Sequence, residues 1–280
     1  MSWKDILIIA ADAETDEPAL ALGQAVAKQH GAHLSAAFLT PLPDEPLAYE
    51  PTVVAGVWAE MLGRARTDAV AARKRLAARL EAMGHPCDLI SAEALSRDLG
   101  RVAALHARYA DVAILTRPVE GVSGDLREEV IEGVLFHSGR PALVAPPGWR
   151  GEGIGKRIVL AWDASREATR ALSEADALLE GAEEVFVVTI DAKPKIFGHG
   201  ETPGANIAAH LQRRGVKAQV RNVESGDRSP AVAISAEVSQ LRADVVVMGG
   251  YAHSRLREMV FGGATRDMLR IASVPLLLAH

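Results

Sequence analysis

Residues 243–250 read Ala-Asp-Val-Val-Val-Met-Gly-Gly, an apolar run that ends in a pair of glycines. The run lacks alternation of polar and apolar residues, which is typical of a strand buried on both faces of a parallel sheet. Similar short runs recur along the chain, and stretches with helical periodicity separate them. Helices between parallel strands form βαβ units, so the sequence predicts an α/β protein. We expect strands at 5–11, 33–39, 87–91, 111–115, 142–145, 157–162, 184–190, 216–223, 244–248 and 275–279.

The chain also repeats itself, because three landmarks return in the same order. The matched pairs are Lys4–Ala10 with Lys156–Trp162, Ala110–Leu115 with Ala243–Met248, and Arg140–Ala145 with Val274–Ala279. Between the copies, residues 146–155 contain two prolines and four glycines, which is the composition of a linker. We therefore expect two tandem domains, over residues 1–148 and 154–280. Each is predicted to be a doubly wound, five-stranded parallel sheet with helices on both faces.

Each half carries a proline-rich stretch after its second strand. In the first half this stretch is 41–51, where proline excludes a helix or a central strand. A long helix over 57–83 is predicted to follow it. In the second half the stretch is 193–203, and a helix over 204–214 follows. Further helices are predicted at 17–30, 166–181 and 263–273.

Composition limits the classes of function. Hydrophobic residues make up 49% and charged residues 24% of the 280 residues, which are values of a folded globular chain. The formal net charge of −5 disfavours a nucleic-acid or anionic-membrane partner. Cys87 is the single cysteine, which excludes an intramolecular disulfide and a cysteine-built metal site and fits a cytoplasmic location. The apolar runs are too short for a membrane span or a signal peptide.

A ligand of such a sheet binds outside the carboxyl ends of its strands, where the strand order reverses. In the second half, Asp163 follows the first strand and can accept hydrogen bonds from a ribose or an adenine amine. The alternative is that Asp163 or Ser165 caps the helix that begins near residue 166.

After the fourth strand, residues 249–265 contain two glycine pairs, and the second pair opens a helix. Glycine allows the backbone to approach an anion closely, and a helix start presents its positive dipole. The segment therefore outlines a phosphate cradle, to which Thr265 can add a hydroxyl donor. The alternative is a glycine-rich turn and helix start with no ligand. Tyr251, within this segment, can stack on a ligand or on a partner, and the alternative is simple packing on the surface of the protein.

This segment resembles the nucleotide-binding stretch of universal stress proteins. The family's pattern is Gly, two residues, Gly, nine residues, Gly, then Ser or Thr. The four places are taken here by Gly249, Ala252, Gly262 and Gly263. The spacing is kept, but Ala252 replaces a glycine and Gly263 replaces a Ser or Thr. Asp163 matches the family's acidic adenosine contact.

The resemblance covers both halves and implies a tandem universal stress protein with an adenine nucleotide alpha hydrolase-like fold. It also implies ATP or AMP as the ligand, with Mg²⁺ accompanying the nucleotide. Ile190 matches a position whose backbone faces adenine. No catalytic residue and no metal ligand is assigned. The residues expected to bind are Ala161, Asp163, Ile190, Met248, Gly249, Ala252, His253, Gly262, Gly263, Ala264 and Thr265.

The first half differs at the corresponding places. Ala11 aligns with Asp163. Counting from the matched prolines places Glu128 and Glu129 opposite the second glycine pair of the other half. Two carboxylates there would repel a phosphate, so we expect the first half to be a degenerate copy that binds no nucleotide.

The leading hypothesis is a stress-response regulatory protein that binds an adenine nucleotide in its C-terminal domain. The alternatives are an interaction module of the same fold without a nucleotide, and a slow ATPase. The sequence does not identify the protein partner. The last strands, 142–145 and 275–279, are apolar edges that must be covered or paired. We therefore expect the two halves to pair through them as an intramolecular pseudo-dimer, with homodimerisation as a further expectation.

Overall fold

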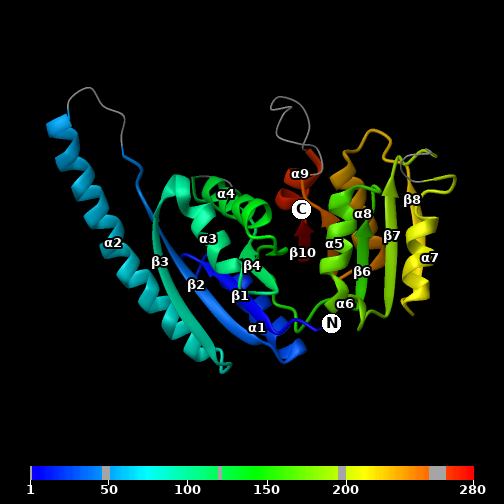
Figure 1. Cartoon of the computed structure of the whole chain (residues 1–280), viewed down its shortest axis with the longest axis horizontal. Helices are drawn as coiled ribbons and strands as arrows, with labels where there is room; N and C mark the ends of the chain where they lie inside the picture. The colour runs from blue at the N-terminus through cyan, green and yellow to red at the C-terminus, as the bar shows by residue number, and fades with distance from the viewer. Residues whose placement is uncertain (1, 46–50, 119–121, 195–199, 252–262) are drawn as a thin grey trace.

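The computed structural model describes residues 2–45, 51–118, 122–194, 200–251 and 263–280 (Figure 1). All ten predicted strands are present. The strands are β1 (Asp5–Ala10), β2 (His33–Leu42), β3 (Cys87–Leu95), β4 (Val112–Thr116), β5 (Ala142–Ala145), β6 (Arg157–Ala161), β7 (Glu184–Ile190), β8 (Ala218–Val223), β9 (Val245–Gly249) and β10 (Leu276–Ala279). The helices are α1 (Glu17–His30), α2 (Pro51–Ala82), α3 (Leu99–Ala107), α4 (Val122–His137), α5 (Arg166–Glu174), α6 (Asp176–Leu179), α7 (Ala205–Arg213), α8 (Pro230–Leu241) and α9 (Gly263–Ile271), with a 3-10 helix, Ser96–Asp98, before α3.

The strands of the described residues form one sheet in the order β3-β2-β1-β4-β5-β10-β9-β6-β7-β8. In each half, the first strand lies between the second and the fourth. β1 pairs in parallel with β4, and β6 pairs in parallel with β9. The strand order therefore reverses beside β1 in the first half and beside β6 in the second. The predicted doubly wound α/β fold is confirmed in both halves.

The two halves join through their last strands, as predicted. β10 pairs antiparallel with β5, with Leu277 opposite Leu143 and Leu276 opposite Val144. All four residues of each strand are buried. The pairing removes two apolar edges that would otherwise be exposed. As a result, a single sheet runs through the whole chain (Figure 1).

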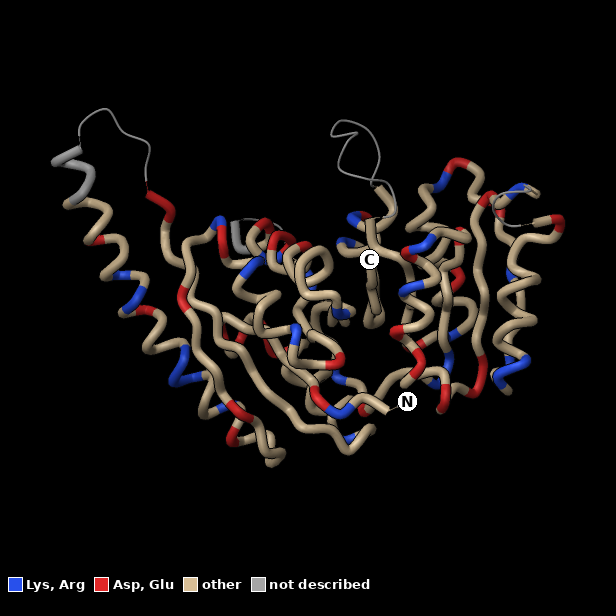
Figure 2. The backbone as a smooth tube through the Cα atoms, viewed as in Figure 1, with Lys and Arg blue, Asp and Glu red and all other residues tan. Residues whose placement is uncertain are grey.

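Two aliphatic layers cover the sheet, one on each face. Helices α1, α2, α5, α6 and α7 pack on one face, with Leu20 and Leu172 among their buried residues. Helices α3, α4, α8 and α9 pack on the other face, with Ile131 and Leu269 among theirs. Basic and acidic residues are interspersed along the backbone of both halves (Figure 2). None of the described helices has the length and apolar content needed to cross a bilayer.

Two aspartates explain one of the repeated landmarks. The carboxylate of Asp111 accepts hydrogen bonds from the backbone N–H groups of Lys4 and Asp5, at 2.6 and 3.1 Å. The carboxylate of Asp244 accepts one from the backbone N–H of Gly155 at 2.8 Å. In each half, the aspartate before the fourth strand thus fixes the start of the first strand. This shared role explains why the sequence Ala110-Asp111 is repeated as Ala243-Asp244.

β2 continues through Pro41 to Leu42, into the stretch 41–51 for which the sequence predicted no helix and no central strand. The neighbouring strand β1 ends opposite Phe38, so the last part of β2 pairs only with β3. A proline without an N–H is tolerated where one side of a strand has no partner. The long helix also begins earlier than predicted, with Pro51 at its first position.

Candidate functional site

The carboxyl ends of β6, β7 and β9 bring several of the predicted site residues together. Ala161, at the end of β6, pairs with Val188 of β7 on one side and with Met248 of β9 on the other. Gly249 follows Met248, and Ile190 lies two residues beyond Val188, where β7 ends. These residues therefore share the edge of the sheet at which the strand order reverses, where open α/β sheets bind their ligands.

Asp163 lies just beyond this edge with its side chain exposed. Its Oδ1 accepts a hydrogen bond from the backbone N–H of Ser165 at 3.0 Å, in a turn where Ala164 has a φ of 62°. Ser165 is the residue that caps α5, because its Oγ accepts from the N–H of Ala168 at 3.0 Å. Among the described residues, no donor binds Oδ2 of Asp163. Ser165 is therefore the residue that caps α5. Oδ2 of the exposed Asp163 has no partner among the described residues.

Gly249 serves the packing of β9 against the start of α5. A Cβ at this position would lie 2.6 Å from the backbone nitrogen of Ala168 and 2.9 Å from Cβ of Glu167. Only glycine permits so close an approach. At Gly250 the nearest atom to an added Cβ is Cδ1 of Leu135, at the ordinary distance of 3.5 Å. The first glycine of the segment is therefore explained by helix packing, without a ligand.

Thr265 is buried in the first turns of α9, with 5% of its surface exposed. Its Oγ1 accepts a hydrogen bond from the backbone N–H of Tyr251 at 3.1 Å. The bond ties together the two described ends of the segment that resembles the family's nucleotide-binding stretch. The oxygen of this hydroxyl thus serves as an acceptor within the protein, while its O–H remains a donor, which is the role predicted toward a phosphate. Three predicted site residues, Ala252, His253 and Gly262, lie outside the described residues.

The start of α9 is suited to an anion. The helix begins at Gly263, which is exposed, and Ala264 beside it is half-buried. The first turn carries no acidic residue, which favours an anion at the positive end of the helix dipole, although the carboxylate of Asp267 follows in the next turn. Among the described residues, the nearest neighbour of a Cβ added at Gly263 would be Oδ2 of Asp267, at 3.6 Å. The described residues therefore leave room for the Ser or Thr of the family's pattern.

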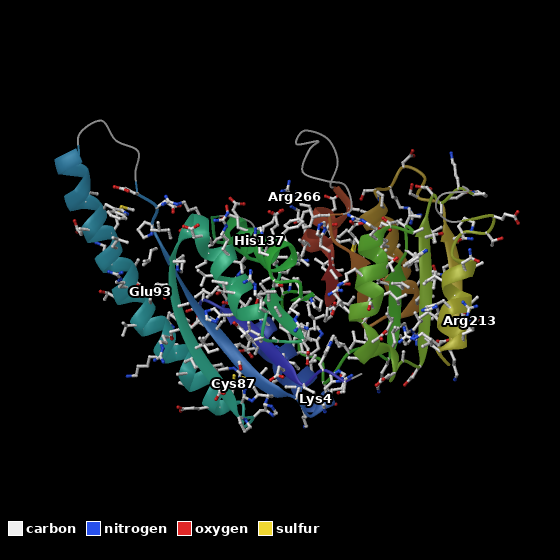
Figure 3. The ribbon with its side chains drawn as sticks, viewed as in Figure 1. Lys4, Cys87, Glu93, His137, Arg213 and Arg266 are labelled. Carbon is white, nitrogen blue, oxygen red and sulfur yellow. The ribbon has the colours of Figure 1, made fainter. Side chains whose placement is uncertain are left out.

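The same region contacts the first half across the seam between β5 and β10. The ring of Tyr251 packs on the ring of Phe136 in α4, with 5.3 Å between the ring centroids. The ring of His280 also packs on Phe136, with 4.7 Å between the ring centroids. Arg266 of α9 binds Glu128 of α4, with 2.5 Å between Nε and Oε1. Figure 3 shows Arg266 above this seam. Tyr251 therefore packs within the chain, on the other half.

In the first half, an internal ion pair lies at the loop after β1, which corresponds to the loop after β6 that carries Asp163. Asp16, 3% exposed, accepts hydrogen bonds through Oδ2 from the backbone N–H groups of Ala11 and Asp12, at 2.8 and 3.0 Å. Its Oδ1 binds Nη2 of Arg127 at 2.7 Å. The backbone donors of the loop after β1 are therefore already used by a carboxylate of the protein.

Glu128 has a different role from the one its alignment indicates. It binds Arg266 of the second half, so its charge is balanced across the seam. Glu129 is exposed. The prediction that the first half binds no nucleotide is therefore better supported by the Asp16–Arg127 pair than by repulsion from the two glutamates.

The fold and the site define a two-domain α/β protein with its candidate binding edge at the carboxyl ends of the strands. Residues 155–280 match the universal stress protein family. The second half of the chain is therefore a universal stress protein domain, and the first half repeats its fold. No curated protein sequence matched the chain.

Two solved structures show that the fold covers both halves. A universal stress protein from Archaeoglobus fulgidus DSM 4304 is similar with a TM-score of 0.69 and 16% identity, over 98% of this chain and 96% of that one. A putative universal stress protein from Pseudomonas aeruginosa UCBPP-PA14 is similar with a TM-score of 0.58 and 15% identity, over 99% of this chain and 93% of that one. At these identities the likeness concerns the fold alone.

Proposed function

We propose that this chain is a regulatory protein of the stress response that binds an adenine nucleotide, ATP or AMP, in its second half. The observation that carries the proposal is the exposed carboxylate of Asp163 at the carboxyl end of β6. Ser165 caps α5, so Oδ2 of Asp163 is free to accept a hydrogen bond from a ribose hydroxyl or an adenine amine. Membership of residues 155–280 in the universal stress protein family supports the same role.

The arrangement of the edge suggests how the nucleotide would lie. The adenosine would contact Asp163 and the end of β7 at Ile190. The phosphates would extend toward the start of α9, where Gly263 and Ala264 place backbone N–H groups and where the first turn has no acidic residue. Mg²⁺ would accompany ATP as the counterion of its phosphates, and we assign it no protein ligand.

The proposal gives one nucleotide per chain. The domain over residues 154–280 would bind it, and the domain over residues 1–148 would be a non-binding copy whose loop after β1 is filled by Asp16. A cytoplasmic location, an unidentified protein partner and homodimerisation belong to the same proposal.

Titration calorimetry of the full chain with AMP and with ATP tests the proposal. We expect one site per chain for either nucleotide. Two equivalent sites would show that the first half also binds, in spite of its internal ion pair. Absence of binding by both nucleotides would favour the alternative, an interaction module of the same fold.

A further inference from the structure

We propose that α4 of the first half positions the phosphate end of the nucleotide site in the second half, with Glu128 and Phe136 as the positioning residues. The inference rests on the proposed function and gives the first half a role in binding at the other site. The role is indirect, because the two residues act through Arg266 and Tyr251. In Figure 1, α4 and α9 lie next to each other in the middle of the molecule, where the ion pair between Glu128 and Arg266 joins them.

The start of α9 is held from two sides. Arg266 is the fourth residue of this helix, and its Nε lies 2.5 Å from Oε1 of Glu128 in the first half. The Glu128 side chain is only 18% exposed, so the pair lies partly within the seam. On its other side α9 packs against α8 of its own half. The direction of the backbone N–H groups at Gly263 and Ala264 therefore depends on α4 as well as on α8.

The residues after β9 also rest on the first half. The rings of Tyr251 and His280 both pack on the ring of Phe136. The backbone N–H of Gly250 donates to the carbonyl oxygen of Ala279 at 2.8 Å, and Nδ1 of His280 lies 3.0 Å from the carbonyl oxygen of Gly250. Both described ends of the segment 249–265 thus contact α4, one through the aromatic rings and the other through the ion pair.

The alignment of the two halves shows how the first half came to supply this support. Glu129 aligns with Gly263, where α9 begins, whereas α4 begins earlier, at Val122. Glu128 therefore lies on a part of α4 that has no described counterpart in α9. The first half places a carboxylate on a helix at this position, and the carboxylate binds the other half.

The charge of Glu128 makes the inference testable by the sign of one effect. Burial, followed by the carboxylates of Glu132 and Glu128, raises the pKa of Tyr251, so negative charge lies close to the segment. If Glu128 acted on the phosphates only by repulsion, its removal would tighten ATP binding. If Glu128 holds the start of α9 in place, its removal weakens ATP binding, because the N–H groups there lose their fixed direction.

The test is titration calorimetry of the full chain and of Glu128→Gln with ATP and with AMP. Gln keeps the size of the side chain and an acceptor oxygen, so the variant should fold. We expect ATP to bind about threefold to tenfold more weakly and AMP to change by less than about twofold, because AMP presents fewer phosphates to α9.

Glu237→Gln is the matched control in the second half. Oε2 of Glu237 lies 3.2 Å from Nε of Arg221, and this pair joins α8 to β8, away from the seam. The control removes one carboxylate from an ion pair and changes the net charge by the same amount. It should leave the affinities for ATP and AMP unchanged.

Two further variants test the route of the effect. In a chain that already carries Arg266→Gln, Glu128→Gln should cause no further loss of ATP affinity, because the pair is already broken. Phe136→Leu keeps an apolar side chain but removes the ring on which Tyr251 packs. It should also weaken ATP more than AMP.

Tighter or unchanged ATP binding by Glu128→Gln, with a native melting curve, would overturn the inference and leave the proposed function in place. An equal loss of affinity for AMP and ATP, or an undiminished effect of Glu128→Gln in the Arg266→Gln chain, would do the same. Absence of binding of both nucleotides to the unaltered chain would instead overturn the proposed function, and this inference with it.

Discussion

Thr265 Oγ1 accepts a hydrogen bond from the backbone N–H of Tyr251 across 3.1 Å. The bond joins the residue that follows Gly250 to the first turns of α9, so it fixes both described ends of the segment that resembles the family's nucleotide-binding stretch. Tyr251 has a φ of 55°, a conformation that costs free energy for a residue other than glycine. The hydrogen bond and the packing of Tyr251 on Phe136 hold the backbone in this conformation.

Replacing Thr265 by Val removes this acceptor and leaves the N–H of Tyr251 buried without its partner. We expect the melting temperature to fall by several degrees, because an unpaired buried donor costs about 1–3 kcal/mol. Thr265→Ser keeps the hydroxyl and should keep most of the stability. Calorimetric melting of both variants checks this. Equal stability of the two variants would show that the hydroxyl is dispensable.

Gly263 occupies the place of a Ser or Thr in the family's pattern, and the described residues leave room for a side chain there. Gly263→Ser should therefore fold normally and bind ATP more tightly, by about threefold to tenfold, if the start of α9 holds the phosphates. Gly263→Ala adds the Cβ without the hydroxyl and should give no such gain. Titration of both variants with ATP separates the two effects. Equal affinities would place the phosphates elsewhere.

Helices α3 and α4 touch through two glycines. A Cβ at Gly133 would meet the backbone of Gly100, and a Cβ at Gly100 would lie 2.6 Å from the carbonyl oxygen of Glu129. Gly133→Ala must push the helices apart, so we expect a loss of about 1–3 kcal/mol of unfolding free energy. Gly63→Ala, on the exposed side of α2 with no neighbour within 4 Å, is the control and should be neutral or stabilising. Denaturant unfolding of both variants measures the difference.

Cys87 lies at the start of β3, at the lower edge of the sheet and far from Arg266 (Figure 3). Burial, together with the carboxylate of Asp88, raises the pKa of its thiol to about 11. The thiol should therefore stay protonated at pH 8 and react with iodoacetamide about a hundredfold or more slowly than an ordinary cysteine, whose pKa is about 8.5. The rate should rise with pH toward 11. Rapid alkylation at pH 8 would contradict this.

The strands were predictable because their residues are continuous apolar runs, which only a doubly covered sheet can bury. The pairing of β5 with β10 followed from the same reasoning, since two short apolar edges need a partner. The positions of Pro41 and Pro51 were harder to predict. Whether proline fits a strand depends on where the neighbouring strand ends, and residues 41–51 do not contain that information.

The contacts between distant residues could not be predicted from spacing. Asp16 directly precedes a helix, which is typical of an N-cap, yet its carboxylate turns back to Ala11 and forward to Arg127. The sequence predicted that Glu128 would repel a phosphate, because the alignment of the two halves gives the position of Glu128. The alignment does not give its partner, Arg266, which balances its charge. In the second half, the sequence identified both Asp163 and Ser165 as capping candidates. The geometry of the turn assigns the cap to Ser165.

The most direct test of nucleotide binding compares Asp163→Ala with Ser165→Ala, in dissociation constants for AMP and ATP and in melting temperature. Asp163→Ala should weaken both nucleotides by about tenfold to a hundredfold, because both carry the same adenosine, with little change in melting temperature. Ser165→Ala should lower stability by about 1 kcal/mol through the lost cap and leave both affinities nearly unchanged. If Asp163→Ala lowers the melting temperature while the dissociation constants for AMP and ATP stay the same, the assignment of Asp163 to the adenosine is wrong.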